Sequence, residues 1–587
     1  MNETPSFPSV SVTRATIALF ALGCATLNLT SAETPEVVKL PDLTIYGAKD
    51  LPPPEDWLYG RMDDGTEVLT NASERASKRL LRDFQLFQQA LEVVWPLPQT
   101  AASPGRSIIL CGRREKFNDF IASDHNSTDI GSTSLFVRDR EQAAIVIDLQ
   151  STTINLSGLE DDEGATTNNF EVDPYKQLYR EYVRYQLSQG GHPPAWLQEG
   201  IAQIVMAMEF APEWIIFGKI DSSAYQPAPA AAATESADED EAAEASLTQT
   251  SVGDRPFNVA LRRRALIPLD KFFAVTADAP EAKNPLGNNR WAKQAYAFVH
   301  LCLYGENGRF QQAFGQFTQR LGKEPVSEAL FKECFKMSYK DMLIELRGYI
   351  SYTNHTYKQF KLKPGGRPLS GAPVALRDAT QAEVGRIKGD AQRLAGQTDR
   401  ALNSYRVAYA RGERDPALLA VLGPAESEAG QTERARTMLE TATKSGLTRP
   451  SAYVELARLR LAGAKTKPAG NDNRLSDEQL ASVLDPLFKA RQLQPAIPTT
   501  YDTIAEAWLA SAALPKPDHL GVLIEGIRLF PGNNPQFLRV AELYRRIGDH
   551  TTATGLAEAG LRLTKDPDAK ARFEQFLASL PSAEKKP

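Results

Sequence analysis

Cysteine and histidine are both scarce in this sequence, and neither is grouped. Four cysteines occur among 587 residues, and no two of them form a Cys-x-x-Cys pair. This spacing excludes a disulfide framework and a zinc ribbon. The six histidines stand singly, with no pair at helical ligand spacing: His125, His192, His300, His355, His519 and His550. We expect His192 to be a turn residue and His300 a satisfied core residue rather than metal ligands.

Several catalytic and binding motifs are missing as well. The sequence contains no Gly-x-Ser-x-Gly motif and no phosphate-binding loop, so serine-nucleophile and P-loop chemistry have no support. The net charge is −6, and the basic residues are spread along the chain. Nucleic acid is therefore excluded as a partner, because its recognition needs a concentrated positive surface.

Long apolar runs are missing beyond the N-terminus. Residues 15–29 form an apolar run between a basic residue, Arg14, and small residues at 30–32. This order is typical of a secretory signal, so we expect residues 1–32 to be removed and the mature chain to start near Glu33. No later run approaches the roughly 18 apolar residues of a membrane span. We expect export to the periplasm, the envelope or the medium, and no membrane span.

The first part of the chain predicts a mixture of helices and strands. Residues 33–54 are rich in proline and polar groups and predict a flexible leader before a domain over 55–355. The expected elements are a hairpin around Asp63-Asp64-Gly65, strands over 107–111 and 143–149, and helices over 76–94, 115–122, 292–303, 310–321, 326–335 and 339–350. Segment 227–250 is acidic and lacks aromatic residues, which predicts a disordered insertion in this domain.

From about residue 380 the chain repeats itself every 34 residues. Gly389, Gly396, Ala401, Tyr405 and Ala408 return as Gly423, Gly430, Ala435, Leu439 and Ala442. Ala457, Ala505 and Ala541 mark three further units, with a polar insert at 465–477, and 573–580 is expected to cap the stack. Small residues at these positions let the two helices of a hairpin approach closely. The pattern resembles the tetratricopeptide repeat and predicts an all-α solenoid over 380–580, after a linker at 356–379.

One stretch of the first domain has the layout of a zinc-protease active site. Residues 175–205 predict a helix, a connector broken by His192-Pro193-Pro194, and a second helix that opens Trp-x-x-Glu-Gly-x-Ala. Together with the later run that starts at Trp291, this order resembles the peptidase MA-like, gluzincin-type metallopeptidases over roughly residues 57–352. The resemblance implies an α+β gluzincin-like fold, with Glu181 in the place of the catalytic base and Glu199 in the place of a zinc ligand.

The departures from that resemblance decide the expected chemistry. Arg180 and Arg184 hold the two positions that it assigns to histidine ligands, and Ala292 stands where it leads us to expect a tyrosine. A guanidinium has donors but no usable acceptor and cannot replace an imidazole ligand. We therefore expect no metal and no cofactor. We expect the two arginines to form a salt-bridge cluster with Glu181 and Glu199; the alternative is that all four are partly solvated remnants.

Three functions are consistent with these patterns. The first is an exported, non-catalytic binding protein, in which a pseudopeptidase domain accompanies a repeat array that takes a protein or peptide partner on its concave face. The second is an active zinc metallopeptidase with an unconventional ligand set. The third is a pure scaffold in which only the repeats matter.

Overall fold

The computed structural model describes most of the chain between residues 51 and 581. The described residues are 51–95, 105–121, 132–150, 153–155, 169–189, 193–211, 213–220, 256–282, 287, 289–321, 324–352, 354–361, 369–446, 449–469 and 473–581. The expected signal 1–32, the expected leader up to residue 50 and the expected acidic insertion 227–250 lie outside them. Within these residues, every helix is too short or too polar to cross a lipid bilayer.

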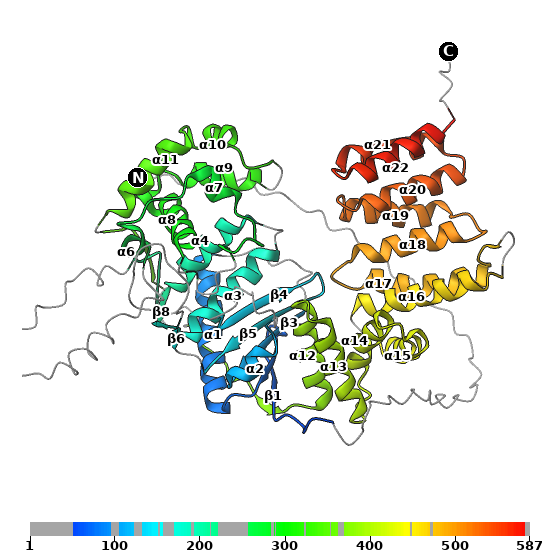
Figure 1. Cartoon of the computed structure of the whole chain (residues 1–587), viewed down its shortest axis with the longest axis horizontal. Coiled ribbons are helices and arrows are strands. Elements are labelled where there is room, and N and C mark those ends of the chain that lie inside the picture. The colour runs from blue at the N-terminus through cyan, green and yellow to red at the C-terminus, as the bar shows by residue number, and fades with distance from the viewer. Residues whose placement is uncertain are drawn as a thin grey trace, which may run out of the picture. The chain divides into compact units, whose positions relative to one another are not determined.

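A six-stranded mixed sheet lies in the first domain, in the order β11-β1-β2-β3-β5-β4 (Figure 1). The strands are β1 (Leu58–Arg61), β2 (Glu67–Thr70), β3 (Gly105–Cys111), β4 (Ser134–Arg138), β5 (Gln142–Asp148) and β11 (Leu376–Asp378). β2, β3 and β5 are parallel, whereas β4, β1 and β11 pair antiparallel with their neighbours. Consecutive residues of β3, such as Ile108 and Ile109, are both fully buried. Both faces of the sheet are therefore covered, as parallel strands require.

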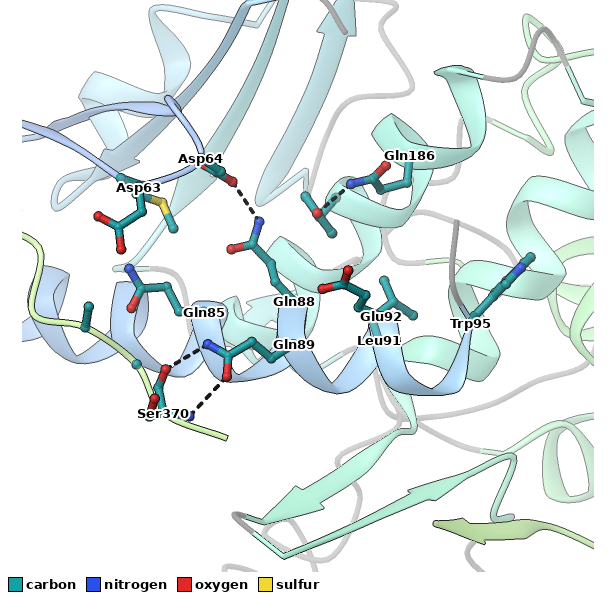
Figure 2. A pocket seen from close by; sticks show the side chains of 14 residues that line it. Asp63, Asp64, Gln85, Gln88, Gln89, Leu91, Glu92, Trp95, Gln186 and Ser370 are labelled. Carbon is teal, nitrogen blue, oxygen red and sulfur yellow. Dashed lines mark hydrogen bonds between the residues drawn. The ribbon is translucent and has the colours of Figure 1, made fainter. Parts of the chain in front are cut away.

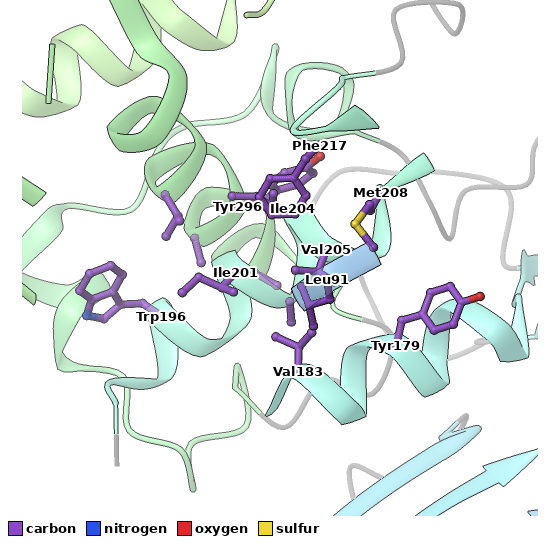
Figure 3. Close-up of a cluster of buried hydrophobic side chains, with 14 of the residues drawn as sticks. Leu91, Tyr179, Val183, Trp196, Ile201, Ile204, Val205, Met208, Phe217 and Tyr296 are labelled. Atoms are coloured by element: carbon purple, nitrogen blue, oxygen red, sulfur yellow. The ribbon is translucent and has the colours of Figure 1, made fainter. Parts of the chain in front are cut away.

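One face of the sheet joins a large apolar core with four helices. These are α1 (Glu74–Val94), α3 (Pro174–Gln189), α4 (Ala195–Met206) and α8 (Arg290–Tyr304). α3 packs on β4 and β5, and α4 contacts both α3 and α8. Figure 3 shows Val183 of α3 close to Val205 of α4 in this core. Gly200 lets α4 and α8 approach closely, because a Cβ there would lie 2.6 Å from the carbonyl oxygen of Ala295.

The other face of the sheet is covered by α2 (Arg114–Asn118) and α12 (Gln381–Leu394). Val384, Ile387 and Ala391 of α12 are buried together with Ile109 and Val146 of the sheet. α12 is also the first helix of the repeat region. The first repeat therefore supplies one layer of the α/β domain.

The remaining elements of the first domain are short. A second sheet contains β8 (Glu209–Ala211), β9 (Trp214–Phe217) and β10 (Lys358–Lys361), and β6 (Thr153–Asn155) pairs with β7 (Asn169–Glu171). The helices are α6 (Phe257–Leu261), α7 (Leu269–Ala274), α9 (Gln311–Leu321), α10 (Glu328–Phe335) and α11 (Tyr339–Ile350), with a 3-10 turn, η2 (Gly305–Gly308).

The expected mixture of helices and strands is present, with two differences. The helix expected over 115–122 is shorter, and α2 ends at Asn118. The segment 356–379, expected to be a linker, contains β10 and β11, which pair with β9 and β1. Strands of three or four residues are too short to show an alternating pattern, so their pairing partners decide the structure.

The C-terminal region is an array of helical hairpins (Figure 1, yellow-green to red), as the 34-residue pattern predicts. After α12 its helices are α13 (Thr398–Ala410), α14 (Pro416–Glu428), α15 (Thr432–Lys444), α16 (Pro450–Thr466), α17 (Asp477–Gln492), α18 (Pro498–Ala510), α19 (Pro517–Leu529), α20 (Asn534–Arg546), α21 (His550–Leu563) and α22 (Pro567–Ser579). Consecutive helices pack in pairs from α12 with α13 to α20 with α21, and α22 packs on α21 where a capping helix was expected.

The repeating small residues let the helices of a hairpin pack closely, as the sequence pattern predicts. A Cβ at Gly389 of α12 would overlap the ring of Tyr405 on α13. One period later, a Cβ at Gly423 of α14 would lie 2.6 Å from Leu439 Cγ on α15. Each glycine therefore lets a large residue of the paired helix reach the helix backbone, which sets the spacing within a hairpin.

Candidate functional site

The candidate site lies between α3 and α4. In α3, Arg180, Glu181 and Arg184 fall within four residues of one another, so helical geometry places them on neighbouring positions of one surface. α4 begins directly after Pro193 and Pro194, and Glu199 stands in its second turn. Proline is favoured at a helix start and disfavoured inside a helix, which explains why the chain turns between the two helices here.

An aromatic core fixes the start of α4. The side chain of Trp196 is fully buried, and five phenylalanine rings lie within 6.3 Å of its centroid: Phe272, Phe273, Phe298, Phe314 and Phe317. Aromatic contacts of this kind contribute about 0.5–1.5 kcal/mol each beyond burial of area. Glu199 is one turn further along α4, so its position follows from this packing.

The four predicted residues form a buried ion-pair cluster. Nη2 of Arg180 donates to Oε2 of Glu199 at 2.9 Å, and Nη2 of Arg184 donates to the same oxygen at 3.0 Å. Nη1 of Arg184 donates to Oε2 of Glu181 at 3.4 Å. Arg180, Glu181 and Glu199 are each at most 2% exposed, whereas the Arg184 side chain is 24% exposed. In these four side chains, two guanidinium groups face two carboxylates.

Further polar side chains complete the cluster. Nε2 of Gln203 donates to Oε1 of Glu199 at 2.9 Å and to the carbonyl oxygen of Gly287 at 2.6 Å. Nζ of Lys293, from α8, donates to Oε1 of Gln203 at 3.0 Å. The hydroxyl of Ser134 lies 2.8 Å from Oε1 of Glu181. Both oxygens of each carboxylate therefore have partners.

The electrostatic effect of the arginines is visible in the ionisation of Glu199. Burial alone would raise the pKa of this carboxyl group, but the charges of Arg180 and Arg184 outweigh that effect and lower its pKa to about 2. Burial would lower the pKa of Arg184, and the two glutamates raise it instead. Both shifts favour the charged forms of Glu199 and Arg184, which supports an ion pair between them.

A divalent metal does not fit this set of side chains. The two guanidinium groups donate to the carboxylate of Glu199, and two fixed cations would repel a third. No group of three or more histidine, cysteine or carboxylate ligands occurs among the described residues. Ala292, in the place of the expected tyrosine, is buried and brings no polar atom.

His300 is a core residue, as expected. It is fully buried on α8, with Nδ1 2.7 Å from the hydroxyl of Tyr349 and Nε2 2.7 Å from the carbonyl oxygen of Gly218. Burial lowers its pKa to about 3, so the imidazole is neutral. Both ring nitrogens already have partners. His125 and His192 lie outside the described residues.

The residues of the site that were missed from the sequence are Ser134, Gln203, Gly287 and Lys293. Gln203 follows Glu199 by four residues in α4, which is a spacing that pairs side chains on one helix face and could have been noticed. Gly287 and Lys293 come from 84 and 90 residues further along the chain than Gln203. Gly287 has a positive φ, and a Cβ there would overlap Glu199 and Gln203, so the residue fits only as glycine.

A surface pocket of about 390 Å³ lies beside α1 and α3 (Figure 2). Its lining includes Asp63 and Asp64 of the first hairpin, Glu92 of α1 and Gln186 of α3. Asp64 accepts a hydrogen bond from Gln88 at 3.1 Å and pairs with an arginine of β3. Tyr182 and Gln186, which line this pocket, stand two residues after Arg180 and Arg184, on the opposite side of α3 from the cluster.

Comparisons with known proteins find solved structures of helical-repeat proteins. No protein-family model and no curated protein matches the chain. YrrB, described as a TPR protein with an unusual peptide-binding site, is 14% identical over 32% of this chain and 90% of its own, with a TM-score of 0.26. TTC0263, a TPR protein of Thermus thermophilus, is 18% identical over 34% of this chain and 99% of its own, with a TM-score of 0.26. MamA of Desulfovibrio magneticus is 18% identical over 32% of this chain and 98% of its own, also with a TM-score of 0.26.

Proposed function

We propose that this chain is an exported, non-catalytic protein- or peptide-binding protein. Its α/β domain is a pseudopeptidase of the gluzincin type, and its tetratricopeptide array takes the partner on its concave face. The observation that carries the non-catalytic part is the double donation of Arg180 and Arg184 to Glu199. Ion pairs occupy the position that a metal and its bound water would need.

The order of elements supports the pseudopeptidase part. α3 and α4 bring residues 180, 181, 184 and 199 within ion-pair distance of one another. The two arginines supply positive charge beside Glu199, as a zinc ion would in such an enzyme. They link the carboxylate of Glu199 on one helix to the neighbouring helix.

One feature supports binding, and another supports export. Stacked helical hairpins present a continuous surface of side chains, which is how repeat arrays bind extended partners. The basic, apolar and small residues at the N-terminus support export. An active metallopeptidase with other ligands and a pure scaffold remain the alternatives.

The test compares the partner-binding of two chains in the native envelope fraction. One is the full chain, and the other ends at Gly412, which keeps α12 as the cover of the sheet but removes most of the array. We expect a protein captured by the full chain to be lost by the shorter one, with no cleavage of the captured protein. Capture by the shorter chain would place binding in the α/β domain, and cleavage would favour the metallopeptidase alternative.

A further inference from the structure

The turn between β4 and β5 contacts three different repeats of the array. It consists of Asp139, Arg140 and Glu141. Asp139 accepts a hydrogen bond from a side chain of α12, in the first repeat. Glu141 accepts a hydrogen bond from the backbone at the start of α16, in the third repeat. Arg140 lies over an aromatic ring at the end of α19, in the fourth repeat. Three consecutive residues of one domain thus each contact a different repeat.

Glu141 caps α16 from outside the array. The residue at the N-cap position of α16, Arg449, makes no capping hydrogen bond with its side chain. The backbone N–H of Ser451, in the first helical turn, donates instead to Oε1 of Glu141 at 2.6 Å. A carboxylate is favoured there because the first-turn N–H groups lack helical partners and carry partial positive charge. Nε of Arg449 lies 3.9 Å from the other carboxylate oxygen.

Asp139 meets a second arginine of the array. Nη2 of Arg393, on α12, donates to Oδ2 of Asp139 at 2.8 Å. Arg393 and Arg449 share one buried carboxylate within the array, Asp390, whose pKa burial would raise but the arginines lower. Two guanidinium groups against one carboxylate leave positive charge on this surface, and the carboxylates of Asp139 and Glu141 face it.

The third contact is aromatic. The guanidinium of Arg140 lies 5.1 Å from the ring centroid of Phe530, the residue that ends α19. Phe530 is 8% exposed, whereas Arg140 is exposed. A cation over an aromatic ring at an exposed position contributes only weakly.

These contacts are polar, whereas the other contact between the α/β domain and the array is apolar. α12 buries Val384, Ile387 and Ala391 against the sheet, and that apolar contact cannot open without exposing the sheet. The turn is held by polar contacts of two kinds. The side chains of Asp139 and Arg393 are 35% and 38% exposed, whereas those of Glu141 and Arg449 are 9% and 12% exposed. The exposed pair contributes little to stability, and release of the turn from the array would not uncover the apolar face of the sheet under α12.

We propose that this part of the array, formed by Arg393, Arg449 and the start of α16, is a carboxylate-binding surface that the β4–β5 turn occupies as a built-in ligand. The partner that it fits is a peptide segment with two carboxylates two residues apart, as in Asp139 and Glu141. Such a segment displaces the turn and takes its contacts. This inference rests on the proposed binding function and specifies the chemistry of the partner.

The test uses a fluorescent peptide with the sequence of residues 137–144, titrated into the full chain and followed by anisotropy. The variant Asp139→Asn with Glu141→Ala removes the two negative charges of the turn but keeps the Oδ1 acceptor that its backbone amides use. We expect this variant to bind the peptide at least tenfold more tightly than the wild-type chain does. Binding should weaken as salt is added, because the contacts are ionic.

Two controls assign the effect to the surface. A peptide with Asn and Ala in place of its two acidic residues should not bind, and adding Arg393→Gln to the variant should weaken binding at least tenfold. If the double variant does not fold, the single change Asp139→Asn gives the same comparison. Equal affinity for wild type and variant, or no binding to either, would overturn the inference. The proposed binding function would still stand in that case if the full chain captures a protein that the chain ending at Gly412 does not.

Discussion

Glu199 holds the candidate site together because both arginines donate to its carboxylate, at 2.9 and 3.0 Å. Arg180 lies 4.0 Å from Glu181, so Glu199 is its closer partner. Removing one member of a buried ion pair leaves the other charge uncompensated, which typically costs about 3–5 kcal/mol. Arg180 is 1% exposed and cannot turn to water without opening the helix pair.

We therefore expect Glu199→Ala to lower the free energy of unfolding by about 3–5 kcal/mol, measured by chemical denaturation. The matched control is Glu324→Ala, which removes an exposed carboxylate paired with Arg320 in the same domain and should change stability little. Similar losses in the two variants would mean that the cluster is solvated rather than buried.

The pH dependence of stability should follow from the same carboxylate. The pKa of Glu199 is about 2 in the folded chain, against an ordinary value of 4.5. A lowered pKa in the folded state stabilises the fold above the ordinary value, and that stability is lost as pH falls from about 4.5 toward 2. Wild type should lose about 3 kcal/mol more than Glu199→Gln does over this range, followed by denaturation at each pH. Parallel losses in the two proteins would refute the assignment.

The residues that could be predicted at the site are those that helix geometry relates. Arg180, Glu181 and Arg184 share α3, and a short connector leads to Glu199, so their meeting follows from local spacing. Lys293 could not be found in this way. It reaches the site through the packing of α8 on α4, which depends on tertiary contacts far apart in the sequence.

At the scale of elements, the helix pairs of the array depend on where glycine stands. Gly389 faces Tyr405 of the paired helix, whereas Gly555 of α21 is exposed and has open space where a Cβ would be. Both glycines are helical, so an alanine substitution raises helix propensity at each. Only at Gly389 does it also disturb packing.

We expect Gly389→Ala to destabilise the protein by about 1–3 kcal/mol, because the added methyl group overlaps the ring of Tyr405. Gly555→Ala should instead stabilise it by about 0.5–1 kcal/mol, since alanine is the better helix former and meets no neighbour. Denaturation curves of both variants and of wild type show whether each substitution raises or lowers the free energy of unfolding. The same sign for both would contradict the packing that the period of 34 predicts.

Elements with a strong period could be predicted, and short ones could not. The 34-residue pattern predicted the hairpins from α12 onward, because each repeat shows the same small and large positions. β10 and β11 contain four and three residues, and only their pairing with β9 and β1 defines them. The segment 356–379, expected to be a linker, contains both of these strands for this reason.

At the scale of the whole described molecule, α12 joins the α/β domain to the array. It is the first helix of the first repeat and also covers one face of the sheet. The boundary expected at residue 380 therefore separates parts that share a core. A repeat helix that is also a core layer cannot be removed without exposing the sheet.

Truncation of the chain tests whether the sheet needs α12 as its cover. A chain that ends at residue 379 loses the cover over Ile109 and Val146 and should aggregate or unfold without cooperativity. A chain that ends at Gly412 keeps α12 and α13 and should retain a cooperative thermal transition. Calorimetry of both chains is the measurement, and a well-folded 379-residue chain would show that the sheet does not need α12.

The central claim is that arginines took the place of metal ligands in the α/β domain, and zinc content tests it most directly. Elemental analysis of purified wild-type protein should find no stoichiometric zinc, because both guanidinium groups occupy the carboxylate of Glu199. The variant Arg180→His with Arg184→His supplies two imidazoles four residues apart beside that carboxylate and should bind up to one zinc per chain. A folded double variant without zinc would mean that the site does not have this geometry. One zinc per wild-type chain would contradict the claim.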